Sequence, residues 1–250
     1  MSDAAGVSVI IPCLHDEVVL RNLLGQLQDE ARRDGQPLQV IVVDGARSQR
    51  CRALCELHGV LWSPADPCRG EQLRQGAALA THDILWFLHA DAELDGQPLA
   101  ELRLAIAEGA VGGYFAFRFS GAPPWQGRLI EWATNWRTRI GVPYGDQGLF
   151  VSRRAYSSVG QHAPWPLFEE VPLVRGLRAQ GELRCIAQGL RVSPRRWQRD
   201  GWWRRCLGNR LLALSFAVGI APQRLARMYA GRPCAARRRG AGGRKRPLGS

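Results

Sequence analysis

The chain has 250 residues and a formal charge of +12, which suits one globular domain with a basic appendage. Hydrophobic residues make up 46% of it and charged residues 22%, so it can bury a sizeable core and is not a disordered protein. The first residues lack the basic flank and apolar run of a secretory signal. The seven cysteines are odd in number and scattered, so we expect reduced thiols in a cytoplasmic protein.

Much of the positive charge is concentrated near the C-terminus. The stretch 232–250 contains seven basic residues and no acidic one, and we expect a disordered tail there. A second cluster of arginines lies between 191 and 210, opposed only by Asp200. Such clusters favour anionic partners, namely nucleotides, acidic lipid or nucleic acid.

Apolar runs alternate with helical periodicity in the first half of the chain. Strands are predicted over 7–12, 38–44, 59–62 and 83–88, and helices over 17–33, 49–58 and 71–81. Near-continuous apolar strands separated by helices indicate a mostly parallel α/β sheet that is covered on both faces. Right-handed crossovers then bring the loops after these strands to one edge of the sheet.

The second half is less regular. A helix over 125–139 is expected to turn Leu129, Ile130 and Trp132 inward. Another helix should cover 169–180, with acidic residues at its start and Pro172 in its first turn. The remaining expectations are a strand over 114–119, a loop leading into a strand over 145–151 and a closing strand over 183–192.

The apolar stretch 211–220 is too short to span a bilayer. Trp197, Trp202 and Trp203 precede it among arginines, a mixture that suits a helix lying on the inner face of an anionic membrane. A helix that packs on the domain and extends its arginine heads into water fits equally well. Both interpretations stay open.

Cys51, Cys55 and His58 can share one face of a helix and so could ligate a metal. They lack the C-x-x-C spacing of a zinc knuckle, and we favour a core role for them.

Acidic residues follow three of the predicted strands. Asp16 comes after the first strand, Asp44 ends the second and Asp91 follows the fourth. Ligands of open parallel sheets bind at these strand ends, and clustered carboxylates repel one another unless a cation or a hydrogen-bonding ligand joins them. A divalent ion held by one or two carboxylates neutralises a departing diphosphate. Neither G-x-G-x-x-G nor G-x-x-x-x-G-K-[ST] occurs, which excludes the usual dinucleotide and P-loop sites.

Several segments in chain order resemble family 2 glycosyltransferases of the GT-A fold, namely Ser8–Pro12, Val40–Gly45 and Phe87–Asp91. Three others, with His89-Ala90-Asp91, are similar to a bacterial subgroup known as arsenosugar-biosynthesis-type glycosyltransferases: Gly145–Phe150, Phe168–Val171 and Arg195–Trp197. The resemblance covers roughly 7–229. It implies a GT-A domain over 1–198, with a donor half over about 7–95 and an acceptor half over about 96–198, followed by C-terminal helices over 199–231 that can contact a membrane.

The resemblance also implies an activity: inverting transfer of a sugar from a nucleotide-diphosphate sugar, with a UDP-sugar expected, to an unidentified acceptor hydroxyl with Mn²⁺ or Mg²⁺. Asp91 would hold the metal, Asp44 would bond the uracil or ribose, and Glu170 would be the general base beside Glu169. The residues implied to bind the nucleotide sugar are Pro12, Asp16, Asp44, Arg69, Gln72, His89 and Asp91. Those implied to shape the acceptor side and close over the diphosphate are Asp146, Gln147, Arg196 and Trp197.

The chain departs from the family pattern in the donor segments, and the nucleotide stays open for that reason. The departures are His15, Ala46, Arg47, Gln49 and Arg74. One alternative is a degenerate GT-A protein that binds a nucleotide or an anionic polymer, although we expect no specific nucleic-acid partner. A sugar nucleotidyltransferase would need a basic glycine-rich loop where the acidic stretch 13–17 stands. A glycosidase would also use paired carboxylates but would not explain the nucleotide-type strand ends.

Overall fold

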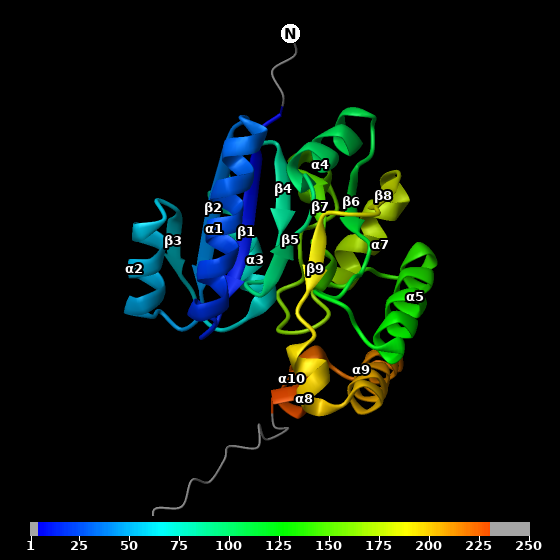
Figure 1. The fold of residues 1–250 in the computed structure, drawn as a ribbon. Helices are drawn as coiled ribbons and strands as arrows, with labels where there is room; N and C mark the ends of the chain where they lie inside the picture. Colours follow the sequence, from blue (N-terminus) through cyan, green and yellow to red (C-terminus); the bar gives the residue numbers. More distant parts are fainter. Residues whose placement is uncertain (1–4, 231–250) are drawn as a thin grey trace, which may run out of the picture.

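A seven-stranded sheet forms the centre of the protein in the computed structural model, which describes residues 5–230 (Figure 1). Its strands, in order across the sheet, are β3 (Leu61–Pro64), β2 (Leu38–Asp44), β1 (Val7–Cys13), β4 (Ile84–Phe87), β7 (Phe150–Ser152), β6 (Gly112–Phe115) and β8 (Leu183–Ile186). Neighbouring strands of this sheet are parallel except at β7, which is antiparallel to both β4 and β6. The predicted mostly parallel α/β sheet is confirmed.

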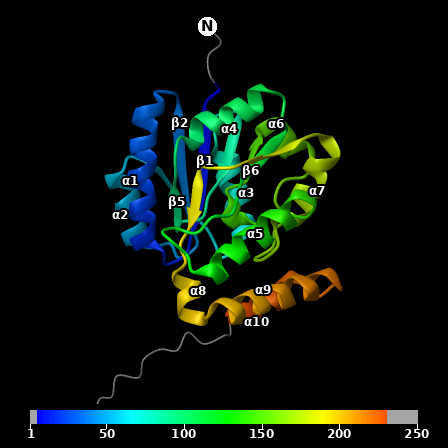
Figure 2. The ribbon, with the colours of Figure 1, turned by 45° about the vertical axis from the view of Figure 1, so that its right-hand side comes forward.

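Helices cover both faces of the sheet (Figures 1 and 2). One face carries α1 (Glu17–Asp34), α2 (Gln49–Leu57) and α4 (Pro98–Ala107), and the other carries α3 (Arg69–Leu79), α6 (Arg153–Ser158) and α7 (Glu170–Gln180). Along β1, Val9 and Ile11 enter the core under α1, whereas Ile10 enters the core under α3. Successive strand side chains point to opposite faces, so burial on both sides accounts for the uninterrupted apolar runs.

Further helices lie beyond the carboxyl ends of the parallel strands, at the bottom of both views (Figures 1 and 2). They are α8 (Arg195–Asp200), α9 (Trp202–Ala217) and α10 (Pro222–Ala230). α5 (Trp125–Ile140) packs beside α9. A small antiparallel sheet, made of β5 (Ala92–Leu94) and β9 (Leu190–Val192), leads into α8. Across residues 5–230, no helix is both long and apolar enough to cross a membrane.

Three predictions for the second half differ from the structure. The closing strand over 183–192 is two strands in different sheets, β8 and β9, because the chain turns at Gly189, whose φ is +143°. Of the three α5 side chains expected to point inward, Ile130 is buried, whereas Leu129 and Trp132 face outward. The buried side of α5 carries Gly127, Ile130 and Thr138. The strand expected over 114–119 coincides with β6 only at its start, because Phe117 and Phe119 leave the sheet to pack with the C-terminal helices.

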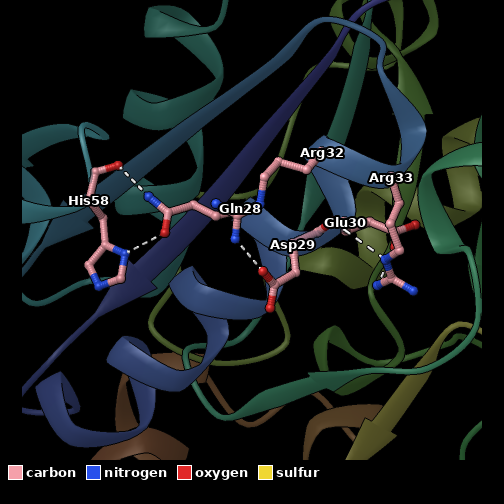
Figure 3. A network of polar contacts seen from close by, with 6 residues as sticks. All are labelled: Gln28, Asp29, Glu30, Arg32, Arg33 and His58. Carbon is pink, nitrogen blue, oxygen red and sulfur yellow. Dashed lines mark hydrogen bonds and ion pairs between the residues drawn. The ribbon is translucent and has the colours of Figure 1, made fainter.

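His58 belongs to the packing between α1 and α2, and no metal is needed to explain it. Gln28 bonds it twice, through its Oε1 at 3.1 Å from His58 Nδ1 and through its Nε2 at 3.0 Å from the His58 carbonyl (Figure 3). Cys51 and Cys55 are fully buried in the core under α1. The predicted core role is therefore confirmed for Cys51 and Cys55, whereas His58 is only partly buried at the end of α2. The predicted basic tail at 232–250 lies outside the described residues.

Candidate active site

A cleft of about 260 Å³ opens at the carboxyl ends of β1 and β4. The register of the sheet creates it, because Cys13 ends β1 beside Asp44 and Phe87 of β4 is paired with Ile10. The chain after β4 therefore passes the turn after β1, at the edge where open parallel sheets bind ligands. The cleft is lined by Pro12, Cys13, Leu14, Asp16, Pro67, Arg69, Gln72, His89, Ala90, Asp91, Pro166 and Arg196.

Two predicted carboxylates, Asp16 and Asp91, line this cleft together. Burial raises the pKa of Asp16; Arg196 opposes this shift and the negative charge of Asp91 adds to it. Arg196 approaches Asp91 with 3.9 Å between Nη2 and Oδ2, too far for a hydrogen bond. The two carboxylates repel each other, and the nearby guanidinium is not hydrogen-bonded to Asp91. A further cation could therefore be stabilised between them.

His89, which the resemblance implies to bind the nucleotide sugar, lies between two cavities. It lines the cleft and also a much smaller adjoining cavity beside Glu169 and Glu170. Burial, reinforced by the positive charges of Arg69 and Arg196, lowers the pKa of His89 well below the usual value. The imidazole is therefore neutral at physiological pH and retains a nitrogen lone pair.

Glu169 and Glu170 lie at the start of α7, buried next to Arg69. Arg69 Nε is paired with Glu169 Oε1, and Arg69 Nη2 lies 3.8 Å from Glu170 Oε2. Burial alone would lower the pKa of Arg69, but the two carboxylates outweigh it and raise the pKa. The guanidinium of Arg69, which the resemblance implies to bind the nucleotide sugar, thus holds the two acids in place.

Glu170 has the protonation behaviour expected of a base that is active near neutral pH. Burial and the adjacent Glu169 raise its pKa to about 8, against the opposing charge of Arg69. Its Oε1 accepts the Gly145 N–H at 3.3 Å. Its Oε2, like Oε2 of Glu169, is buried without a hydrogen-bond partner among the described residues. Such oxygens are costly to leave unpaired, so a ligand hydroxyl is a natural partner for them.

Asp44 lies outside the cleft lining and is fully buried. Its Oδ1 accepts the Ala46 N–H at 2.9 Å, and its Oδ2 accepts Ser48 N–H at 2.7 Å and Trp62 Nε1–H at 3.3 Å. These bonds fix the loop between β2 and α2. The nucleotide contact implied for Asp44 stays a prediction, and the carboxylate is already occupied by its own loop.

Asp44 and the thiols of Cys13 and Cys51 come within 4.8 Å of one another. The hydrogen bond to Cys51 and burial both raise the pKa of Cys13, so the thiol stays protonated. Because metals take the thiolate and the carboxylate is occupied, we assign this group to the core.

The remaining predicted residues divide between cleft and scaffold. Gln72 lines the cleft, but its Nε2 group donates hydrogen bonds to the carbonyls of Cys13 and Val43 and so connects β1 with β2. Gln147 is buried and donates to the Phe115 carbonyl at 3.1 Å. Trp197 packs on Phe119 in the aromatic cluster under α8. These three therefore shape the site, and Arg196, next to Trp197, reaches the cleft.

Asp146 follows Gly145 in a short 3₁₀ helix, and burial raises its pKa against the charges of Arg69 and Arg137. It lies near the acids of α7 without lining either cavity described.

Pro67 and Pro166 also line the cleft and were not predicted. Pro166 is brought there by the loop 163–166, which presses on α3 so closely that a Cβ on Gly70 would stand 2.0 Å from the Ala163 carbonyl. Gly70 donates to the Trp165 carbonyl at 2.9 Å. The only signal in the sequence was a glycine in the first turn of a helix, which indicates a close approach without naming the partner.

These features define a cleft lined by carboxylates and arginines at the strand ends of an α/β sheet. The chain matches the model of Glycosyl transferase family 2 over residues 8–157. It belongs to this family and is a glycosyltransferase. No curated protein matches it in sequence.

Solved structures share the fold. The mannosyltransferase PcManGT from Pyrobaculum calidifontis, in complex with GDP-Man and Mn²⁺, matches with a TM-score of 0.61 and 18% identity, over 92% of this chain and 70% of that one. Mannosyl-3-phosphoglycerate synthase from Rubrobacter xylanophilus matches with a TM-score of 0.54 and 15% identity, over 83% of this chain and 74% of that one. Glucosyl-3-phosphoglycerate synthase from Mycobacterium tuberculosis, in complex with Mn²⁺, UDP and glucosyl-3-phosphoglycerate, matches with a TM-score of 0.51 and 18% identity, over 74% of this chain and 69% of that one. At these identities the likeness concerns the fold, and the predicted GT-A fold is confirmed.

Proposed function

We propose that this glycosyltransferase transfers a sugar, with inversion, from a nucleotide-diphosphate sugar to an acceptor hydroxyl. One observation carries the proposal: Glu170, a buried carboxyl with a pKa raised to about 8 and an oxygen that lacks a hydrogen-bond partner, lies in a cavity that shares His89 with the cleft of Asp91. A base on one side and a diphosphate site on the other are what a single displacement requires.

In the proposed step the acceptor oxygen bonds to the anomeric carbon while the bond from that carbon to the diphosphate oxygen breaks. The hydroxyl proton passes to Glu170, and the nucleoside diphosphate leaves with the electron pair of the broken bond. Arg196 supplies positive charge at the cleft. Arg69 keeps Glu169 and Glu170 in position.

The donor set fits a divalent cation. Asp91 and Asp16 offer carboxylate oxygens and His89 a neutral ring nitrogen within one cleft, which suits Mn²⁺ or Mg²⁺. Asp91 is the proposed ligand, and a bound ion would neutralise charge on the diphosphate. Solved structures of similar fold contain Mn²⁺ with GDP-Man or UDP. A UDP-sugar donor and membership of the arsenosugar-type subgroup rest on the sequence motifs and belong to the proposal.

The test measures release of UDP or GDP from a panel of nucleotide sugars, with Mn²⁺, Mg²⁺ or a chelator. Asp91→Asn should lose most metal-dependent turnover. Asp95→Asn is the control, because Asp95 lies four residues away and pairs with Arg191 at 3.1 Å. Unchanged turnover in Asp91→Asn would remove its role, and release of pyrophosphate from a nucleoside triphosphate would instead favour nucleotidyl transfer.

A further inference from the structure

Two helices that the proposed reaction does not use carry exposed apolar stripes. On α5 the stripe consists of Trp125, Leu129, Trp132, Trp136 and Ile140, which are between 42% and 77% exposed. On α9 and its C-cap it consists of Trp203, Leu207, Leu211, Leu214 and Val218, between 51% and 77% exposed. Members of each stripe are spaced by three or four residues and therefore share one side of their helix.

The two stripes are continuous at one end. The Trp125 and Trp203 rings, the first members of each, lie 5.8 Å apart between centroids. The helices are packed closely there, because a Cβ on Gly127 of α5 would stand 3.0 Å from the Trp202 ring. Opposite sides of the same helices, with Ile130 on α5 and Leu212 on α9, are buried in the domain. The stripes together form one outward surface, which we call the α5–α9 face.

This face has arginines beside it and almost no acidic residues. Helices α5, α8, α9 and α10 contain eleven arginines and two acids, Glu131 and Asp200. Both acids are engaged, Glu131 with the Phe119 N–H at 2.6 Å and Asp200 with Arg199 and Arg205 at 2.8 Å. With about 3.6 residues per turn, one exposed arginine lies on each side of the α9 stripe, and two more border the α5 stripe. They are Arg204 and Arg210, and Arg128 and Arg139.

We propose that the α5–α9 face docks on the surface of an anionic phospholipid membrane. Apolar stripes would enter the boundary between head groups and acyl chains, and the bordering arginines would meet lipid phosphates. Four of the ten stripe residues are tryptophans, the side chain most enriched at membrane–water interfaces. A solvated helix would leave this apolar area facing water, which monomeric proteins seldom do.

A second copy of the chain fits the face less well. A two-fold interface places the same patch on both partners, so it would bring arginines against arginines with no free acid on the face to compensate. Docking also has a geometric consequence for the cleft. α8, which supplies Arg196 to the cleft, is joined to α9 through Gly201, so the cleft lies one short helix from the docked surface.

The experiment uses the full chain and vesicle co-sedimentation. Two vesicle types are compared, phosphatidylcholine alone and phosphatidylcholine with one third phosphatidylglycerol. The triple variant Trp132→Ser, Trp136→Ser, Leu211→Ser removes apolar area from both stripes without touching the cleft. The matched control Val18→Ser, Leu57→Ser, Leu104→Ser removes exposed apolar side chains from α1, α2 and α4. Thermal unfolding and nucleotide binding establish that both variants are folded.

We expect the wild-type chain and the control to bind the anionic vesicles. The stripe variant should bind them at least about ten-fold more weakly. Arg128→Gln with Arg204→Gln should reduce binding to the anionic vesicles specifically. Three results would overturn the proposal. The first is that the stripe variant binds as well as the wild type, which would assign the binding to the basic stretch 232–250. The second is that the wild type binds neutral and anionic vesicles equally. The third is that sedimentation velocity shows a wild-type dimer that is absent in the stripe variant.

Discussion

Glu170 carries two opposing demands. Its burial against Glu169 favours the protonated carboxyl, but a general base must be ionised to accept a proton. The fraction of ionised Glu170 in the free enzyme therefore increases as pH rises through about 8.

We predict that kcat/KM rises with pH and levels off above about 8, since this ratio reports groups of the free enzyme. Glu170→Gln should remove the rising limb together with most of the activity. Glu101→Gln, on the exposed side of α4, is the control and should keep the profile. A wild-type rate that stays flat from about pH 6 to about pH 9, an interval that extends at least about one pH unit to each side of this pKa, would contradict the assignment.

The same shift should appear in stability. The ordinary pKa of 4.5 is raised in the folded state, so the folded chain binds more protons than the unfolded chain between about 4.5 and 8. The stabilising contribution of this group is complete below about 4.5 and is lost as pH rises through 8. Unfolding free energies of wild type and Glu170→Gln, measured in urea across this interval, should diverge in favour of the variant.

Asp44 is predicted to matter for folding before it matters for binding. Asp44→Asn places an amide NH₂ against the backbone N–H donors of Ala46 or Ser48, and one buried hydrogen bond is lost. We expect a loss on the order of 1–3 kcal/mol in unfolding free energy. Asp66→Asn is the control, because its ion pair with Arg47 is well exposed and such pairs contribute about 0–1 kcal/mol. Equal effects of the two substitutions would contradict this account.

At the level of elements, α3 packs closely against β1 and β2 because Gly76 has no side chain. A Cβ on Gly76 would stand 2.4 Å from Ile10 Cγ2 and 3.1 Å from Val43 Cγ2. Gly76→Ala should therefore destabilise the chain by about 1–3 kcal/mol through overpacking. Gly25→Ala in α1 meets nothing within 4 Å and should stabilise by up to about 1 kcal/mol through helix propensity. Denaturant midpoints measure both, and shifts of the same sign would be the contrary result.

The elements of the first half could be predicted because each strand and helix has a local signature. Leu38–Asp44 matches β2 throughout, and the long apolar runs of β1 and β4 required burial on two faces. α5 shows where this reasoning fails. It has two apolar sides, one with Ile130 and one with the tryptophans, and periodicity alone does not say which side meets the core.

The site was predictable where it follows the strand ends and unpredictable where distant segments meet. Asp16, His89 and Asp91 follow β1 and β4 and do line the cleft. The contact of Arg69 with Glu169 joins residues 100 positions apart, and no local pattern encodes it. Asp44 was correctly placed at the sheet edge, but its three hydrogen bonds depend on how its own loop closes.

For the whole molecule, donor binding should stabilise the fold, since a ligand that binds only the folded state adds RT ln(1 + [L]/Kd). At about 100 times Kd this amounts to about 2.7 kcal/mol, or roughly 5–10 °C in Tm for a chain of this size. We expect such an increase with a nucleotide sugar and Mn²⁺ together, and a smaller one with the nucleotide sugar alone. Asp91→Asn should lose the metal-dependent increment. The same increment in Asp91→Asn would place the metal elsewhere.

The small sheet of β5 and β9 sets limits on how this chain can vary in length. Asp91 directly precedes β5, and Arg196 follows β9 by four residues. Their pairing at 3.9 Å depends on the register Ala92 with Val192. An insertion or deletion at 193–194 would rotate α8 about its axis and carry Arg196 off the cleft. Residues 96–97, between β5 and α4 and beyond the pair of Asp95 with Arg191, do not position Arg196. Length changes should therefore be tolerated on one side of this ribbon and excluded on the other.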